Sequence, residues 1–260
     1  MANLPLVIAP MKLIYHPLSP YSRKAYMAAL EYGLADTITL QKVVVCPTHY
    51  PGWSDNVPDL VAAGNPLAKI PTLVIQHLEN GDIPIFDSRV ICGFLRDISG
   101  DKSGSSGYLE QAREGTLLSI ADGILDAQIL ITYELRIRAE KGLLMPEWLE
   151  GQKTKQRRGL DALERHLEGK NVLLKQRKQD EPATIAEITV AAMVGCIIGG
   201  AKDLEWSVGR PKLAAWFEVW KQRESFTKTR ATIDWKTGEK IGLGPNPSRK
   251  FDPKAENVKL

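Results

Sequence analysis

Two short segments place a hydroxyl or a carboxylate where a helix is expected to begin. In SPYSRK (residues 19–24), Ser19 is a good N-cap residue, and Pro20 suits the first helical position because proline has no amide hydrogen to lose there. An apolar run at 13–15 precedes this segment and Gly33 ends it, which predicts a strand, a turn and a helix. The free amides and the helix dipole favour a negative charge in front of Ser19, and a thiolate is such a charge.

The second segment, IFDSRV (85–90), sets Asp87 and Ser88 before a predicted helix. The apolar positions of that helix are Val90, Ile91, Phe94, Leu95 and Ile98. Exposed amides and the Ser88 hydroxyl can hold a carboxylate, while Asp87 can pair with an ammonium group. For either segment alone, a capped helix start without a ligand is the simpler interpretation.

A third segment, NPLAKIPTLV (65–74), puts Pro71 directly before an apolar run that predicts a strand. Proline cannot donate to a central ladder, so Pro71 is expected to start the strand or to hold a special turn. Together, in this order within about ninety residues, the three segments resemble the glutathione-binding half of a cytosolic glutathione transferase. SPYSRK is similar to the SPFSRR motif of the plant tau-type members, in which the first serine faces the thiol.

The resemblance implies a binding role for residues of all three segments. The Ile70–Pro71 bond would be cis, with the Ile70 backbone paired to the cysteinyl main chain of glutathione. Ser88 and the helix amides would hold the γ-glutamyl carboxylate, and Asp87 would pair with the γ-glutamyl ammonium. Two lysines, at 42 and 69, would reach the glycyl carboxylate, although most lysines are simply solvated.

Thiol activation explains why a hydroxyl is wanted at this helix start. A free thiol with a pKa near 8.5 is mostly protonated at pH 7, and lowering that pKa by about two units takes roughly 2.7 kcal/mol. The helix dipole supplies about 0.3 to 1 kcal/mol, whereas a hydrogen bond to a charged group adds about 1.5 to 3 kcal/mol. We therefore assign the donor role to Ser19, with Ser22 as the competing candidate inside the helix. A serine rather than a cysteine favours thiolate attack on an electrophile over thiol–disulfide exchange.

The electrophile side is less marked in the sequence. Tyr21 is expected to pack or to line the cleft, and Tyr133 and Arg136 in TYELRIR resemble cleft residues of bacterial and fungal members. Trp206 stands before the final helix as a further cleft aromatic. A solvated helix face for Arg136 and ordinary packing for the aromatic residues are equally compatible with the pattern.

The predicted function is that of a glutathione transferase with glutathione as co-substrate, a small hydrophobic electrophile, no metal and a two-fold homodimer. A non-catalytic regulatory or assembly module is the main alternative, and a glutathione-dependent lyase (an etherase) or isomerase is another. Ser19, Asp87 and Ser88 argue against a pure scaffold, which has no need for them.

Composition excludes several other classes. The 260 residues carry 34 basic and 31 acidic side chains, a formal charge of +3 that indicates neither a nucleic-acid nor an anionic-membrane partner. The three cysteines share no metal-ligand spacing and fit a reducing compartment. Cys92 and Cys196 lie in apolar helical patterns and are expected to be buried. For Cys46, an exposed and oxidisable thiol is an alternative to burial.

The start of the chain lacks a secretion signal, and the apolar stretch 188–201 is too short to span a membrane, so we expect a cytoplasmic protein without a membrane partner. The terminal VKL resembles a peroxisomal tripeptide only loosely.

The order of predicted elements gives the fold class. Residues 11–98 are predicted to form a strand, a helix, a strand, a short helix, two strands and a helix, in that order. This order is that of an α/β thioredoxin-like glutathione-binding domain. Its strands after the first are predicted at 37–45, 72–75 and 83–86, with Asn80-Gly81 as a hairpin turn.

The segment SGDKSGSSG (99–107) is predicted to be a flexible linker. Residues 108–230 form an all-α C-terminal domain, with helices predicted at 108–138, 146–167, 188–198 and 210–224, and a capping box at Thr184. Residues 231–260 are predicted to be a polar extension.

Overall fold

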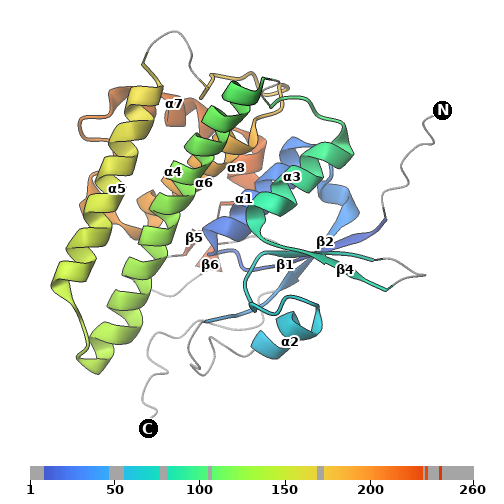
Figure 1. Ribbon diagram of the computed structural model, residues 1–260, viewed down its shortest axis with the longest axis horizontal. Coiled ribbons are helices and arrows are strands. Elements are labelled where there is room, and N and C mark those ends of the chain that lie inside the picture. Colours follow the sequence, from blue (N-terminus) through green and yellow to red (C-terminus); the bar gives the residue numbers. More distant parts are fainter. Residues whose placement is uncertain are drawn as a thin grey trace.

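A four-stranded mixed sheet forms the centre of the N-terminal part of the protein (Figure 1). The structure is a computed structural model that describes residues 9–46, 56–76, 81–104, 107–168, 173–230, 232–233 and 240–241. The strands are β1 (Met11–Tyr15), β2 (Ile38–Lys42), β3 (Thr72–Ile75) and β4 (Ile83–Ile85), in the spatial order β2-β1-β3-β4. β1 pairs in parallel with β2, and the other two pairs are antiparallel.

The strand register brings four chain segments to one end of this sheet. Tyr15 pairs with Lys42, so β1 and β2 end side by side. Ile14 pairs with Thr72, so the start of β3 lies next to the end of β1. β4 runs antiparallel to β3 and therefore also ends here. The segments that follow β1, β2 and β4, and the segment that precedes β3, consequently leave the sheet at the same end.

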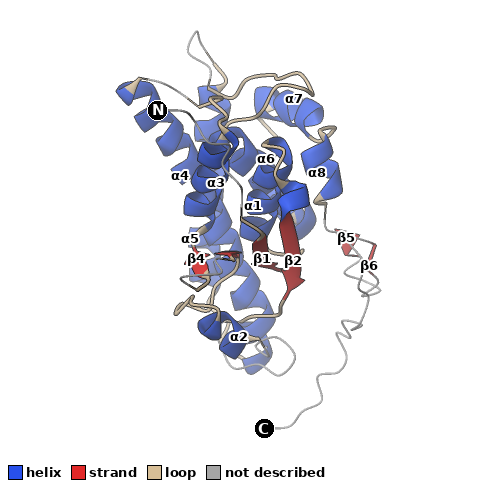
Figure 2. Cartoon of the chain, turned by 90° about the vertical axis from the view of Figure 1, so that its right-hand side faces the viewer, coloured by secondary structure: helices blue, strands red, loops and turns tan. Residues whose placement is uncertain are grey.

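Helices cover both faces of the sheet. α1 (Pro20–Glu31) and α3 (Ser88–Ser99) pack against each other on one face, and α2 (Val57–Ala62) lies on the other, as both Figure 1 and Figure 2 show. The alternation of side chains along β1 explains this arrangement: Leu13 enters the large core under α1 and α3, whereas Ile14 joins a smaller cluster with Leu60 of α2. This is the thioredoxin-like domain that the sequence predicted.

The C-terminal part is helical, as predicted. Its main helices are α4 (Tyr108–Tyr133), α5 (Pro146–His166), α6 (Ile185–Gly200), α7 (Pro211–Trp220) and α8 (Glu224–Lys228), with short turns at Glu134–Arg138, Ala139–Lys141, Lys202–Leu204 and, in the N-terminal part, Ala35–Thr37. α4 packs against both α5 and α6. By length and composition alone, the run Tyr108–Lys141 would be able to cross a membrane, and 44% of its apolar window is buried within the protein.

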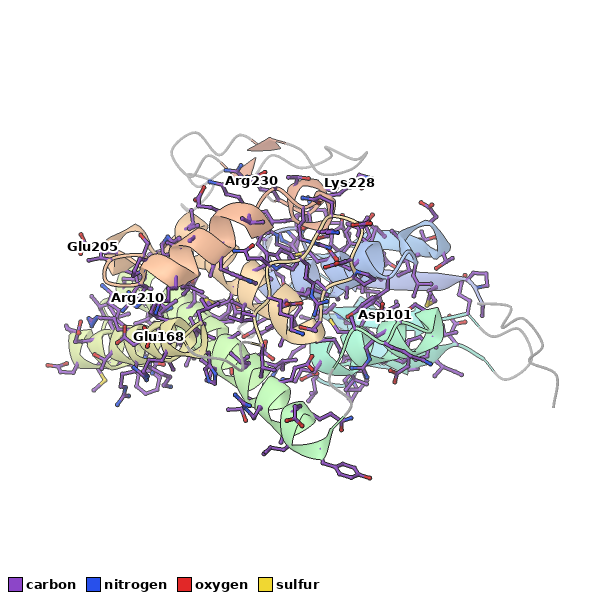
Figure 3. All side chains as sticks on the ribbon, turned by 90° about the horizontal axis from the view of Figure 1, so that it is seen from above. Asp101, Glu168, Glu205, Arg210, Lys228 and Arg230 are labelled. Carbon is purple, nitrogen blue, oxygen red and sulfur yellow. The ribbon has the colours of Figure 1, made fainter. Side chains whose placement is uncertain are left out.

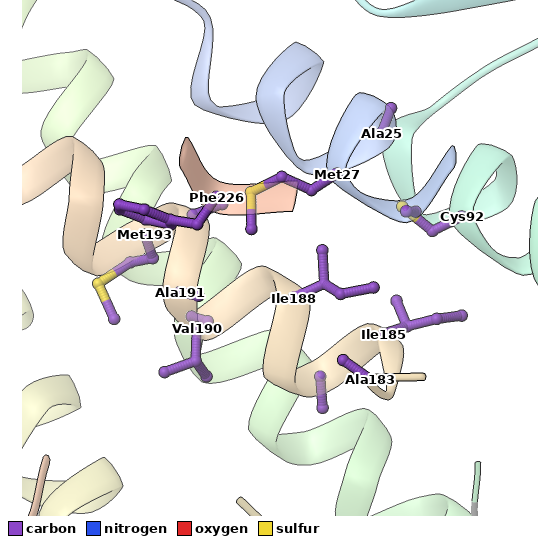
Figure 4. Packing of buried hydrophobic residues seen from close by; sticks show 14 of the residues in the cluster. Ala25, Met27, Cys92, Ala183, Ile185, Ile188, Val190, Ala191, Met193 and Phe226 are labelled. Carbon is purple, nitrogen blue, oxygen red and sulfur yellow. The ribbon is translucent and has the colours of Figure 1, made fainter. Parts of the chain in front are cut away.

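α6 lies at the centre of the core and joins the two parts. All residues from Ile185 to Val194 are buried. In Figure 4 the side chains of Met27 from α1 and Cys92 from α3 lie near those of Ile188 and Ile185 on α6. The two domains thus share one apolar core, which fixes how α1 is placed relative to the helices.

Several predicted boundaries shift. The second strand covers residues 38–42 rather than 37–45, because Thr37 ends the short helix Ala35–Thr37 and its hydroxyl donates to the Leu34 carbonyl. The third helix of the helical domain begins at Ile185, directly after the Thr184 cap. The Asn80-Gly81 turn lies partly outside the described residues, although β3 and β4 pair as a hairpin requires.

The prediction of one final helix at 210–224 is wrong. α7 ends at Trp220, the chain turns, and α8 begins at Glu224. The turn is needed because the buried Arg223 points back to Glu31 of α1 and Phe226 packs into the core. Beyond it, where no strand was predicted, β5 (Thr232–Ile233) pairs with β6 (Lys240–Ile241). Figure 3, seen from above, labels Arg230 close to this small sheet.

Candidate functional site

The start of α1 carries Ser19 at the N-cap position, as the sequence predicted. Its Oγ accepts a hydrogen bond of 3.2 Å from the Ser22 amide. This bond uses a lone pair of the hydroxyl oxygen, so the Ser19 hydroxyl proton is still available for donation. Ser22 is fully buried, and its hydroxyl accepts a bond of 3.4 Å from the His16 amide. Of the two serines, only Ser19 has solvent access at the helix start.

The segment before β3 contains the cis Ile70–Pro71 peptide that the resemblance implied. Asn65 is completely buried beneath this turn, and its amide nitrogen donates to the Lys69 carbonyl at 2.9 Å and to the Thr72 hydroxyl at 2.8 Å. Asn65 therefore ties both sides of the turn together. This role of Asn65 was not predicted from the sequence, although the residue opens the NPLAKIPTLV segment.

The start of α3 is more exposed to solvent at its cap residue than the start of α1. Asp87 is the N-cap residue, and its Oδ1 accepts a bond of 2.9 Å from the Arg89 amide. Its carboxylate is exposed, whereas Ser88 is buried. Lys42, at the end of β2, is exposed at the same end of the sheet.

The register thus gathers the predicted binding residues from four separate segments. They are Ser19, Lys42, Lys69, Ile70, Pro71, Asp87 and Ser88. Two helix starts with free amides and a polar cap, on either side of a turn, form a surface that suits an anion at each helix start and an ammonium beside Asp87.

Polar contacts between α1 and α4 close one side of this surface. The Tyr21 hydroxyl donates to the carboxylate of Asp126. Lys24 is fully buried, and its ammonium lies 2.8 Å from Asp122, which also accepts from Arg89 of α3 at 2.7 Å. Asp122 of the helical domain therefore holds α1 and α3 at once. Nothing in the sequence marks this group of charges, because a lysine in a helix is usually solvated and the partner of Lys24 lies 98 residues away.

The end of α4 carries the predicted cleft residues Tyr133 and Arg136. Both are half-buried. Burial raises the pKa of Tyr133, and an electrostatic interaction with Cys46 raises it further. Because Cys46 follows β2, this interaction brings Tyr133 near the segment after that strand. Burial lowers the pKa of Arg136. Arg136 falls in the π-helical turn Glu134–Arg138, a kind of irregularity often found at functional sites.

Trp206, the third predicted cleft residue in the helical domain, does not lie on α4 with Tyr133 but between α6 and α7. Its ring meets that of Phe217 edge-on at 5.6 Å, and Phe217 in turn meets Phe226 at 5.3 Å. This row ends on the guanidinium of Arg23, which lies 3.9 Å from the Phe226 ring centre. The structure therefore places Trp206 in a packed aromatic row within the helical domain.

All three cysteines have free thiols. The alternative of an exposed Cys46 is wrong, because its side chain is buried. Burial raises the pKa of Cys92 to about 12 and that of Cys196 to about 11. These two thiols stay protonated at neutral pH. In the described part of the chain, no three His, Cys, Asp or Glu side chains gather as metal ligands.

Comparison with known proteins gives the family of the chain. A profile described as "Glutathione S-transferase, N-terminal domain" matches residues 18–98. No curated protein matches the sequence significantly. A glutathione transferase family member from Pseudomonas fluorescens Pf-5, crystallised with bound glutathione, is 33% identical over 86% of this chain and 100% of its own, with a TM-score of 0.70. A second crystal structure of a glutathione transferase family member from this organism contains S-(propanoic acid)-glutathione. It is 33% identical over 85% of this chain and 100% of its own, with a TM-score of 0.68.

A third solved structure is more distant. The glutathione S-transferase from Methylobacterium radiotolerans, in complex with glutathione sulfonate, is 26% identical over 85% of this chain and 94% of its own, with a TM-score of 0.68. The domain match covers the segments that carry the two helix starts, and the Pseudomonas relative extends the similarity through the helical domain. The chain is therefore a member of the glutathione transferase family.

Proposed function

We propose that the protein is an active glutathione transferase, which lowers the pKa of the glutathione thiol at Ser19 and directs the thiolate to a hydrophobic electrophile. The observation that carries this proposal is the shared sheet end. There the register sets the Ser19 helix start, the cis-Pro71 turn and the Asp87–Ser88 helix start around one surface.

Each part of glutathione has a matching group on this surface. The Ile70 backbone pairs with the cysteinyl main chain. Ser88 and the α3 amides hold the γ-glutamyl carboxylate, and the exposed Asp87 carboxylate pairs with the ammonium. Lys42 and Lys69 are exposed and reach the glycyl carboxylate. The glutathione bound in the Pseudomonas relative supports glutathione as the ligand of this surface.

Ser19 supplies the donor that the thiolate requires. The cap bond from the Ser22 amide fixes the Ser19 oxygen and leaves its proton for the sulfur. A charge-assisted hydrogen bond of about 1.5 to 3 kcal/mol, added to the helix dipole, is enough to lower the thiol pKa by about two units. The full burial of Ser22 supports Ser19 as the donor.

The electrophile then lies between this helix start and α4, with Tyr21, Tyr133 and Arg136 as its candidate contacts. Packing of Trp206 on Phe217 favours a structural role for that residue. A cytoplasmic location in detoxification fits the three free thiols. A homodimer fits the exposed apolar side chains of Leu67, Val90 and Leu109, which a second subunit would cover.

The test is turnover of 1-chloro-2,4-dinitrobenzene with glutathione by the purified protein, alongside calorimetry of glutathione binding. We expect both binding and conjugation. Binding without turnover across a panel of aryl halides, epoxides and enones would favour the non-catalytic module. Cleavage of an aryl ether without net conjugation would favour the lyase. The absence of binding would contradict the site itself.

A further inference from the structure

The contact between Tyr21 and Asp126 gives the electrophile side a defined polarity. Tyr21 is half-buried in the first turn of α1, and its hydroxyl donates to the Asp126 carboxylate. Asp126 is exposed, and among the residues that the structure describes no lysine or arginine forms an ion pair with it. Its neighbour Lys24 is held by Asp122 at 2.8 Å. Within the described part of the chain, an exposed carboxylate without a paired lysine or arginine thus lies beside the proposed thiol-activating helix.

The position of Asp126 on α4 places it in the wall of the reaction site. Asp122, Asp126 and Tyr133 are spaced four and seven residues apart, so they share one face of the helix. Asp122 is bound to α1 and α3, and Tyr133 lies near Cys46 after β2. Asp126 is between them and reaches α1 two residues after Ser19.

The chemistry of the pair excludes hydrogen-bond donation to a substrate. A phenol has one proton, and that of Tyr21 is given to Asp126, so its oxygen offers only lone pairs. Burial, the bond to Asp126 and the charges of Asp126 and Asp122 together raise the pKa of Tyr21, so the phenol stays neutral. The Tyr21–Asp126 pair therefore presents acceptor oxygens and a negative charge to the substrate. Developing anions such as nitro or enolate oxygens need donors instead.

We propose that Tyr21 and Asp126 select electrophiles that carry a cationic group, such as an ammonium. This inference rests on the proposed function, since it concerns the second substrate of the same reaction. The cation would lie against the Asp126 carboxylate and the Tyr21 oxygen, while the reacting carbon faces the thiolate at Ser19.

Two benzyl chlorides of equal shape test the proposal. One carries a para trimethylammoniomethyl group, and the other carries a neopentyl group, which replaces the charged nitrogen by carbon. For the wild-type protein we expect kcat/KM, divided for each chloride by its rate constant with glutathione alone, to favour the cation by about fivefold, the upper range for a partly exposed ion pair. Asp126→Asn should bring this ratio close to one. In the wild type, raising the salt from 0.05 to 0.5 M should shrink the ratio, because exposed charges are screened.

Tyr21→Phe is the matched variant, because it removes the phenol and keeps the carboxylate. It should retain a preference for the cation that Asp126→Asn loses. If neither chloride is turned over, their inhibition constants against 1-chloro-2,4-dinitrobenzene give the same ratio. A wild-type ratio of one or less, or a ratio unchanged in Asp126→Asn, would overturn the proposal. The absence of wild-type turnover with every electrophile of the panel, including 1-chloro-2,4-dinitrobenzene, would instead contradict the proposed function.

Discussion

The two helix starts at the site have the same local design but different surroundings. Ser19 of α1 accepts from the Ser22 amide at 3.2 Å, and Asp87 of α3 accepts from the Arg89 amide at 2.9 Å. Behind its cap, α1 is embedded: Lys24 is fully buried. The start of α3 opens to solvent at Asp87. In the proposed function, thiol chemistry would therefore depend on how the helical domain holds α1, whereas γ-glutamyl binding would depend mainly on the exposed cap of α3.

The last turn of α1 shows the same embedding. The side chain of Glu31 is buried, and Arg223 from the turn before α8 lies 2.6 Å from it. The Glu31 carboxylate also accepts from the Ala183 amide at 3.2 Å and from the Ser225 hydroxyl. The last turn of α3 carries only the more exposed pair Arg96–Asp97, at 2.9 Å. In its last turn, α1 is thus held by a buried charge pair, whereas the last turn of α3 carries a more exposed one.

Glu31→Ala should give the largest effect. It leaves the Arg223 guanidinium buried without its carboxylate, which costs about 3 to 5 kcal/mol of unfolding free energy. Urea unfolding followed by circular dichroism measures this loss. The matched change on α3, Asp97→Ala, should cost less than about 1 kcal/mol because its pair is exposed. Equal losses from the two variants would remove the contrast between the helices.

Asp87→Asn should act on binding alone. Asparagine caps a helix as well as aspartate does, so the unfolding free energy should stay within about 0.5 kcal/mol. The lost charge should weaken glutathione by about 1.5 to 3 kcal/mol in binding free energy, or roughly 10- to 150-fold in Kd. Calorimetry measures the Kd. An unchanged Kd would show that Asp87 only caps α3.

Ser19→Gly should act on the chemistry with little effect on binding. Glycine is a tolerable N-cap residue, so stability should fall by only a few tenths of a kcal/mol, whereas Ser19→Ala should cost about 1 kcal/mol. In both variants the pKa of the bound thiol should rise by about one to two units, equivalent to about 1.4 to 2.7 kcal/mol. Turnover at neutral pH should fall and partly recover at high pH, because more thiolate forms there.

The pH profile of thiolate absorbance in the complex with glutathione measures that pKa. Ser22→Ala serves as the control and should leave the profile in place, because Ser22 is fully buried. A shift in Ser22→Ala with none in Ser19→Gly would transfer the donor role to Ser22. No shift in either variant would leave the helix amides as the main partners of the thiolate.

Contacts between residues close in the sequence are the features of this protein that the sequence predicts best. The Ser19 cap and the Thr184–Glu187 capping box both join residues three positions apart, and the structure contains both. Side chains and amides at this spacing meet whenever the helix forms, so residue types alone predict them. The resemblance of the three segments similarly anticipated the cis Ile70–Pro71 bond and the thioredoxin-like fold.

Contacts between distant segments were decided only by the tertiary structure. Asp122 meets Lys24 across 98 residues, and the chain breaks its last helix so that Arg223 can reach Glu31. Cys46 is buried although it precedes a proline-containing loop. No local pattern marks which of several lysines or aspartates will be buried. That depends on where packing of α4 and α6 on α1 removes water, and the partner then follows because a buried charge requires one.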